Sequence, residues 1–223
     1  MKIPRWKHVL SYLTDIHLMS IVSHKNGPMQ LFYSSGEFKL TTLNVVYSWG
    51  KHYRSFAKAI TDLKVLEQKN IESVLVLGWG MGSIAKLLED HPSVKKITGV
   101  DHDGTLVKLY NAEFKDQSPF DIKLHVADAM KFVMDDLQQY DLICCDIFVD
   151  NITPPKIIAK PFLSNIHRLL KPNGLVLLSK LNRTTLDRKQ NEVLEHNLRD
   201  LNIDFQSLKS FGNSIYWWRK ENK

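Results

Sequence analysis

The sequence predicts an α/β fold, a doubly wound and mostly parallel sheet with a small β extension at its N-terminus. Three observations support this prediction. An apolar run over residues 74–77 ends in Gly78, Gly80 and Gly82 and leads into a helical pattern. Three later apolar runs each end in or beside an aspartate, and a hairpin signal closes the chain. Near-continuous apolar runs are typical of parallel strands that helices cover on both faces.

The glycine turn predicts a ligand-binding bend between a buried strand and a helix. Gly78, Gly80 and Gly82 lack a Cβ, so the backbone there can turn tightly and approach a ligand closely. The helical pattern that starts at Ser83 presents free N–H groups at the same place. A tight turn that binds nothing is the alternative, because similar strings are common in many proteins.

The next three strands are predicted to end in carboxylates. Asp101, Asp128 and Asp146 each follow one of the apolar runs. The ligand crevice of a doubly wound sheet lies outside the carboxyl ends of its strands, so these acids and the glycines are expected to converge on one cleft. Asp103 is expected to cap the helix that starts near Gly104. This leaves Asp101 free to bind a ribose diol.

Short strands separated by turn signals are predicted ahead of the parallel sheet. The turn signals are Asn26-Gly27-Pro28 and Ser34-Ser35-Gly36, because glycine, proline and asparagine mark turns. The sequence therefore predicts an N-terminal β extension with a linking helix over residues 1–70, and a ligand-binding domain over residues 71–223. The strands of the extension are expected at residues 16–23, 29–33 and 37–42.

Aromatic residues gather just before the linking helix, which is expected to run through residues 56–65. Tyr47 and Tyr53 are predicted either to form a lid or wall over the cleft, or to pack between the extension and the main domain. For Trp49, packing is the favoured interpretation. His52 is a candidate base, because the unperturbed pKa of histidine, about 6.5, suits proton transfer.

The elements after Asp146 complete the predicted sheet. A stiff loop at Pro154 and Pro155 is expected at the mouth of the cleft. A helix ended by Pro172 and Gly174 follows it. A fifth strand, a polar helix and a hairpin with a Gly-Asn turn come next. The expected ranges of these elements are residues 156–170, 175–180, 184–201, 205–210 and 214–219.

Together these strings resemble a class I S-adenosylmethionine-dependent transferase, and more closely its spermidine synthase branch. The resemblance covers about residues 71–180 and implies a seven-stranded, Rossmann-like methyltransferase sheet. It rests on the glycine string, the acid after the second strand, Asp-Ala after the third, Asp after the fourth, and a later Leu-Leu-Lys-Pro-Asn-Gly. These strings lie at residues 74–78, 100–103, 127–132, 140–143 and 169–174.

The resemblance implies roles for the residues of the cleft. Asp101 would bind the cofactor ribose, Asp128 with the backbone of Ala129 would bind adenine, and Asp146 would face the reacting centre. The implied cofactor is S-adenosylmethionine or its decarboxylated form. The other implied cofactor contacts are Gly78, Trp79, Gly80, Gly82 and His102. The further candidate catalytic residues are Tyr47 and Tyr53.

Two positions depart from the spermidine synthase pattern. The family has an aspartate between its second and third glycines, where this chain has Met81. It also has Asp-x-x-Asp-Pro after the fourth strand, whereas here the second acid, Asp150, is one residue late. Those family acids hold the aminopropyl amine and the polyamine, so their loss favours methyl transfer to an unidentified acceptor. Aminopropyl transfer to a polyamine and cofactor binding without turnover remain alternatives.

Composition limits the class of protein. The 223 residues, 43% of them hydrophobic, suit one α/β core with a small extension. No run approaches the ~20 apolar residues of a membrane helix. The first residues lack a signal-peptide core, so a cytoplasmic protein is predicted. Cys144 and Cys145 are adjacent in a strand and point to opposite faces, so they are expected to be buried and unpaired, and no metal site is expected.

The predicted partners are a small-molecule acceptor, with an amine as one candidate, and a second copy of the chain, because related synthases often form dimers. The net charge of +6 raises RNA or DNA as an alternative methyl acceptor. Lysines and arginines are spread along the sequence, however, and residues 215–218 alternate as in a half-buried strand. Nucleic-acid and membrane partners are therefore not expected.

Overall fold

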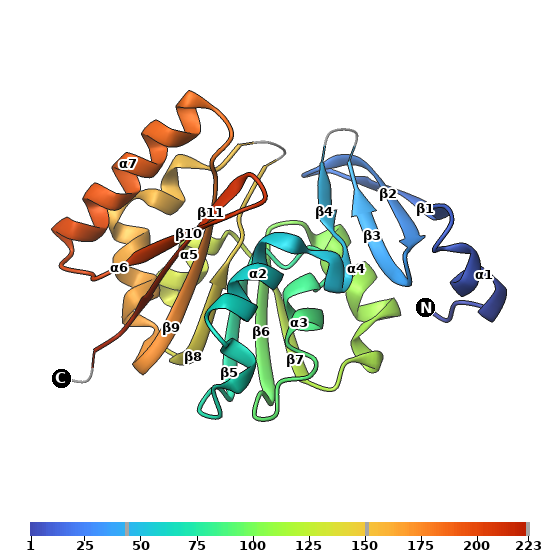
Figure 1. Cartoon of the computed structure of the whole chain (residues 1–223), viewed down its shortest axis with the longest axis horizontal. Helices are drawn as coiled ribbons and strands as arrows, with labels where there is room; N and C mark the ends of the chain where they lie inside the picture. The colour runs from blue at the N-terminus through green and yellow to red at the C-terminus, as the bar shows by residue number, and fades with distance from the viewer. Residues whose placement is uncertain (43–44, 150–151, 222–223) are drawn as a thin grey trace.

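The computed structural model describes residues 1–42, 45–149 and 152–221. It contains a seven-stranded sheet with helices on both faces and, beside it, a four-stranded antiparallel sheet from the N-terminal part of the chain (Figure 1). The α/β fold class predicted from the sequence is confirmed. Within the described residues, no helix is both long enough and apolar enough to cross a membrane.

The large sheet has the strand order β10-β11-β9-β8-β5-β6-β7. Strands β5 to β9 are parallel, and β11 runs antiparallel to both β9 and β10. The order reverses between β5 and β8, and a ligand crevice is expected at such a switch point. The strands span Ser73–Leu77 (β5), Lys96–Asp101 (β6), Asp121–Val126 (β7), Tyr140–Cys145 (β8), Leu170–Leu181 (β9), Gln206–Ser210 (β10) and Asn213–Arg219 (β11).

Helices cover both faces of this sheet (Figure 1). On each face, the strands and helices pack together through a separate apolar cluster. Successive residues of a strand point to opposite faces. Cys144 accordingly packs in one cluster and Cys145 in the other, and both are fully buried with free thiols, as predicted. The first face carries α2 (Arg54–Asp62), α3 (Ser83–Leu87) and α4 (Gly104–Glu113), and the second carries α5 (Ala129–Asp135), α6 (Lys160–Arg168) and α7 (Thr185–Asp200).

The small sheet is an antiparallel meander that packs on α4 through a third apolar cluster. Its first three strands match the predicted extension, while its fourth, which contains Tyr47, had no predictive pattern because it has only three residues. A short helix, α1 (Arg5–Leu10), precedes the sheet and has no buried residue. The strands span Ile16–Ser23 (β1), Gly27–Ser34 (β2), Glu37–Thr41 (β3) and Val46–Ser48 (β4).

Two predicted helices are shorter than the sequence pattern indicated. The linking helix α2 ends at Asp62, and Lys64 has a left-handed φ of 50° before a short 3-10 turn over Val65–Glu67. The helix predicted for residues 156–170 is a 3-10 turn, Pro155–Ile158, followed by α6. Ala159 between the two is extended, with a ψ of 144°, and Pro161 in the first turn of α6 lacks the N–H that would continue the helix back to residue 157.

The last strands also differ in detail from the prediction. Strand β9 begins at Leu170, so Pro172 and Gly174 lie inside it rather than ending a helix. The ladder to β8 shifts register between Tyr140 and Leu142, which accommodates this irregular start. The closing hairpin turns through Phe211 and Gly212 alone, with φ values of 47° and 83°. Two consecutive positive φ angles are typical of a two-residue hairpin turn.

The indole of Trp79 fills the space beneath the glycine turn. It is 3% exposed and meets the ring of Tyr110 edge to face, with 4.9 Å between ring centroids. Strand β6 passes under this ring at Gly99, where an added Cβ would overlap both Trp79 and Leu124. A side chain is therefore excluded at Gly99 by packing.

We expect Gly99→Ala to lower the free energy of unfolding by about 1–3 kcal/mol, because overpacking a filled core forces neighbouring side chains to move. Urea denaturation followed by circular dichroism measures the change. Gly104→Ala is the matched control, because an added Cβ there meets Val126 at an ordinary 3.4 Å. Equal unfolding midpoints for the two variants would contradict the packing argument.

Candidate functional site

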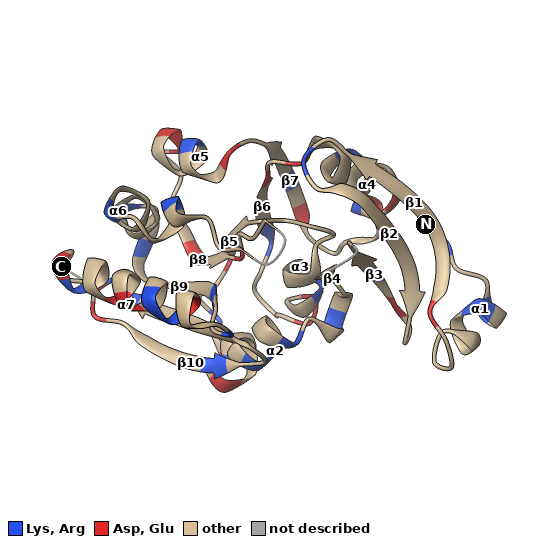
Figure 2. Cartoon of the chain, turned by 90° about the horizontal axis from the view of Figure 1, so that it is seen from above, with Lys and Arg blue, Asp and Glu red and all other residues tan. Residues whose placement is uncertain are grey.

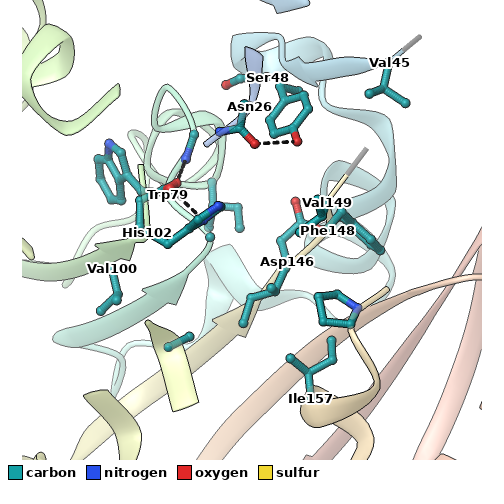
Figure 3. A pocket seen from close by; sticks show the side chains of 18 of the residues that line it. Asn26, Val45, Ser48, Trp79, Val100, His102, Asp146, Phe148, Val149 and Ile157 are labelled. Atoms are coloured by element: carbon teal, nitrogen blue, oxygen red, sulfur yellow. Dashed lines mark hydrogen bonds and ion pairs between the residues drawn. The ribbon is translucent and has the colours of Figure 1, made fainter. Parts of the chain in front are cut away.

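A cavity of about 410 Å³ opens at the carboxyl ends of β5, β6 and β8, close to the switch point of the sheet (Figure 3). Its size lies within the usual range for small-molecule sites, about 300–1,000 Å³. Segments from the N-terminal sheet and from the C-terminal strands complete its wall. Ten of the eleven residues predicted for the site line it, namely Tyr47, Tyr53, Gly78, Trp79, Gly80, Asp101, His102, Asp128, Ala129 and Asp146.

The glycine turn presents only part of its length to the cavity. Gly78 has a φ of 88°, and an added Cβ there would overlap the backbone carbonyl of Asp146. At Gly80, with a φ of 55°, an added Cβ would lie in ordinary contact with Ser48 and the Tyr47 carbonyl, 3.7 Å away, and Gly80 lines the cavity. Gly82, a predicted cofactor contact, does not line this cavity. Gly82 caps α3 and faces a separate hollow on the far side of the turn, together with Met81.

Trp79 lines the cavity, but its indole ring is packed in the protein core. The side chain belongs to the apolar cluster under the sheet and is almost fully buried. Its backbone N–H donates to the Val100 carbonyl at 3.2 Å, which fastens the turn to the end of β6. Any contact between Trp79 and a ligand therefore comes mainly from its backbone.

Asp101 is not left free as the sequence predicted, because both of its carboxylate oxygens accept backbone hydrogen bonds. Oδ2 accepts from the Gly80 N–H at 2.8 Å and Oδ1 from the Asp103 N–H at 2.9 Å. Burial raises the pKa of Asp101, while the two N–H groups act to lower it. Each oxygen retains a second lone pair, so Asp101 can still accept from a ligand.

The two residues after Asp101 have different places in the structure, one at a helix cap and one on the cavity wall. Asp103 caps α4 by accepting from the Thr105 N–H at 2.9 Å, as predicted. His102 is about one-third exposed on the cavity wall, with its Nδ1 3.6 Å from Asp101 Oδ1. The imidazole therefore lies beside the carboxylate that the resemblance assigns to the ribose.

Asp128 is both a helix cap and a wall residue. Its Oδ1 accepts from the Met130 N–H at 2.8 Å at the start of α5, next to Ala129. Its Oδ2 forms an ion pair with Lys156 at 3.0 Å. Burial acts to raise the pKa of Asp128, but Lys156 and the amides outweigh it, so the pKa lies below its ordinary value. The group is half exposed and anionic at neutral pH.

Asp146 and Tyr53 form a close pair in the cavity wall. The Tyr53 hydroxyl donates to Asp146 Oδ2 at 2.5 Å across 93 residues of sequence. Burial raises the pKa of Asp146 to about 6, against the opposing effect of hydrogen bonds from Tyr53 and Ser179. Burial, with the nearby Asp146 charge, raises the pKa of Tyr53 well above its usual range. The proton therefore stays on the tyrosine, and Asp146 is the group that titrates.

The N-terminal sheet contributes the opposite wall. The Tyr47 hydroxyl donates to Asn26 Oδ1 at 2.9 Å (Figure 3). The hydroxyls of Ser48 and Ser83 are hydrogen-bonded at 2.5 Å, and the Trp49 N–H donates to Ser83 Oγ at 2.9 Å. These bonds join β4 to the first turn of α3, directly behind the glycine turn.

Sequence reasoning missed Asn26, Ser83, Lys156 and Arg183, all of which line the cavity. Asn26 carried only a turn signal. Ser83 directly follows the glycine turn, which could have pointed to it. Lys156 and Arg183 follow no spacing that a single sequence distinguishes from ordinary surface positions.

Other predicted features lie at the edge of the cavity or outside it. His52, the candidate base, does not line it. Its Nε2 lies 3.1 Å from the Ser35 carbonyl, and its ring packs on Trp49 with centroids 5.2 Å apart. The predicted packing role of Trp49 agrees with a hydrogen bond from its Nε1 to the Ser34 carbonyl at 3.2 Å. Pro154 lies at the mouth of the cavity as expected, while Asp150 and Asn151 lie outside the described residues.

In the view of Figure 2, basic and acidic positions are interspersed along α7, whereas α1 carries basic positions alone. In the part of the chain that the structure describes, no three His, Cys, Asp or Glu side chains are grouped so that they could hold a metal ion.

Comparison with solved structures agrees with the observed fold. A spermidine synthase in complex with the transition-state analogue AdoDATO has a TM-score of 0.72 at 15% identity, covering 93% of this chain and 75% of that one. Human methyltransferase-like protein 13 in complex with SAH has a TM-score of 0.62 at 19% identity, covering 76% and 83%. Both likenesses show the fold alone, a Rossmann-like sheet shared by the two classes of transferase.

Comparison of sequences identifies the family. A polyamine aminopropyltransferase of Leptospira biflexa is 29% identical over 144 residues, which cover 62% of this chain and 50% of that protein. The chain spans at most about half the length of such curated relatives. The family model for the spermine/spermidine synthase domain matches residues 54–208, most of the chain. The chain therefore belongs to the spermine/spermidine synthase family.

Proposed function

We propose that the protein is a transferase that binds S-adenosylmethionine or its decarboxylated form and moves a group from the sulfonium to an amine nucleophile beside Asp146. The observation that carries the proposal is the convergence of Gly80, Asp101, Asp128 and Asp146 on one cavity at the switch point of the sheet. In this proposal residues 71–223 bind the cofactor and residues 1–70 help to enclose the acceptor. The free, buried thiols suit a cytoplasmic protein.

The residues of the cavity fit an adenosyl group. Asp101 would accept the ribose hydroxyls with its remaining lone pairs while its existing bonds hold the Gly80 amide in place. Gly80 lines the cavity and has no Cβ, so its backbone would let the cofactor approach closely. Asp128 and the backbone of Ala129 would bind adenine where α5 begins.

Asp146 and Tyr53 would act on the nucleophile. When bound, a sulfonium cofactor supplies an electrophilic carbon and leaves as a neutral thioether. The protein then needs mainly to hold the nucleophile in line with that carbon. The Asp146 carboxylate would orient an amine and accept its proton as the new N–C bond forms, and the Tyr53 hydroxyl fixes the position of Oδ2.

Membership of the family favours aminopropyl transfer to an amine as the reaction, in place of the methyl transfer that the sequence alone favoured. Methyl transfer remains the second candidate because of one specific observation. Met81, which replaces the family aspartate, packs against the apolar cluster of the N-terminal sheet and does not line the cavity. Among the described residues, the cavity therefore has only Asp101, Asp128 and Asp146 as carboxylates.

The identity of the thioether product tests the proposal. We expect the protein, given decarboxylated S-adenosylmethionine and a panel of amines, to release methylthioadenosine, which mass spectrometry detects. Release of S-adenosylhomocysteine from S-adenosylmethionine would instead establish methyl transfer. The Asp146→Asn variant serves as the inactive control. Tight cofactor binding without release of either product would contradict the transferase proposal and indicate a protein that binds the cofactor without turnover.

The role of Asp101 predicts a specific loss of affinity. We expect Asp101→Ala to weaken cofactor binding in calorimetric titration by about 1.5–3 kcal/mol, because the ribose hydroxyls lose a charged acceptor. Asp116→Ala, a substitution at an exposed aspartate outside the cavity, should bind as the wild type does. An unchanged affinity in a folded Asp101→Ala variant would contradict the assignment.

The raised pKa of Asp146 predicts pH-dependent binding of the cofactor. A nearby cation favours the ionised carboxylate, so the bound cofactor should lower the pKa of Asp146 from its value of about 6 in the free protein. Affinity should therefore be constant above about pH 7 and fall as pH drops below 6, by up to about tenfold per pH unit. Titrations from pH 5 to 8 measure this dependence.

Two controls isolate Asp146 from Asp101 and His102, which also lie at the cavity. The Asp146→Asn variant should lose the pH dependence. Methylthioadenosine, which carries no sulfonium charge, should bind the wild type with little change over the same range. Equal pH profiles for the charged and neutral ligands would refute the link to Asp146.

A further inference from the structure

A continuous path of hydrogen bonds runs from the N-terminal sheet to the glycine turn. It starts at Tyr47 on β4, whose hydroxyl donates to Asn26 Oδ1 at 2.9 Å. Asn26 lies in the turn between β1 and β2, and its Nδ2 donates to Asp103 Oδ2 at 2.6 Å. Figure 3 shows Asn26 at one edge of the cavity, with its side-chain amide in a hydrogen bond.

The path continues through the loop between β6 and α4. The backbone N–H of Asp103 donates to Asp101 Oδ1, and Asp101 Oδ2 accepts from the Gly80 N–H. Asp103 is 1% exposed and accepts a further bond from Ser23 at 2.5 Å. Every step of this path is between described groups, and its two ends line the same cavity.

The chemistry of the partners fixes the orientation of the Asn26 amide. Burial acts to raise the pKa of Asp103, but the bonds from Ser23, Asn26 and Thr105 outweigh it and hold the pKa below its ordinary value. Asp103 is thus anionic and only accepts hydrogen bonds, so it requires the NH₂ of Asn26. The amide oxygen then faces the Tyr47 hydroxyl. An aspartate at position 26 has the same shape but offers no donor.

We propose that Asn26 is a positioning residue of the cofactor site, which couples the seating of the N-terminal sheet to the geometry of Asp101 and the Gly80 amide. The inference rests on the proposed function for its cofactor. It gives the extension a second task besides enclosing the acceptor, because the sheet holds the loop that carries the ribose-binding carboxylate. By linkage, a bound cofactor in turn stabilises the position of Tyr47.

The test compares Asn26→Asp with Lys25→Ala. Both substitutions lower the net charge by one in the same turn, but Lys25 is exposed and does not line the cavity. We expect Asn26→Asp to raise the dissociation constant for the cofactor about tenfold or more, because a buried carboxylate loses its donor. Lys25→Ala should bind as the wild type does. Asn26→Ala serves as a milder second variant if Asn26→Asp does not fold.

Hydrogen exchange in the free protein provides a readout that does not need the cofactor. Mass spectrometry of peptides over residues 76–84 and 100–106 should show faster exchange in Asn26→Asp or Asn26→Ala, with the melting temperature close to that of Lys25→Ala. Such local loosening together with weaker binding supports the inference. Unchanged exchange in these peptides, or unchanged affinity in a folded variant, overturns it. If the wild type binds neither cofactor, the proposed function is refuted instead. The exchange result alone then tests whether Asn26 couples the N-terminal sheet to Asp101 and the Gly80 amide.

Discussion

The site depends on the carboxylate of Asp101, which bonds to the glycine turn on one side and to the next loop on the other. A buried carboxylate is expensive to desolvate unless it is hydrogen-bonded. Here two backbone N–H groups, from Gly80 and Asp103, satisfy one lone pair of each oxygen. Bonds from N–H groups to an ionised acceptor are stronger than neutral ones. The same interaction shapes the turn and leaves acceptor capacity for a ligand.

The parallel sheet and most of the site were predictable because their signals are periodic or local. Cys144 and Cys145 lie on opposite faces because adjacent strand residues alternate. The capping role of Asp103 followed from its place before a helical pattern. By contrast, three glycines at alternate positions look alike in sequence. Only the packing of the turn shows that Gly80 faces the cavity while Gly82 faces Tyr110.

The remaining features were hidden because they depend on contacts between distant segments. Strand β4 is too short to show a period, and it exists because it pairs with β3. Asn26 gave a turn signal that was correct but incomplete, since its side chain bonds to a loop 77 residues away. His52 is of a residue type that can act as a base, yet the chain places its ring against Trp49 outside the cavity. Chemical suitability alone could not fix its position.

The segment that matches the family model does not supply the whole cavity wall. The family model begins at residue 54, whereas Asn26, Tyr47 and Tyr53 precede it. Gly80, Asp101, Asp128 and Asp146 lie within the matched segment, so the cavity is lined from both the matched segment and the residues before it.

The two cysteines have a practical consequence. They are the only thiols in the chain, both are fully buried, and burial raises their pKa values well above the ordinary range. A thiol-specific reagent attacks the thiolate, so both native side chains resist alkylation in the folded protein. A fluorophore or spin label attached at a cysteine introduced at Val46, 44% exposed on β4, would thus report on the surroundings of the small sheet at the cavity against an unlabelled background.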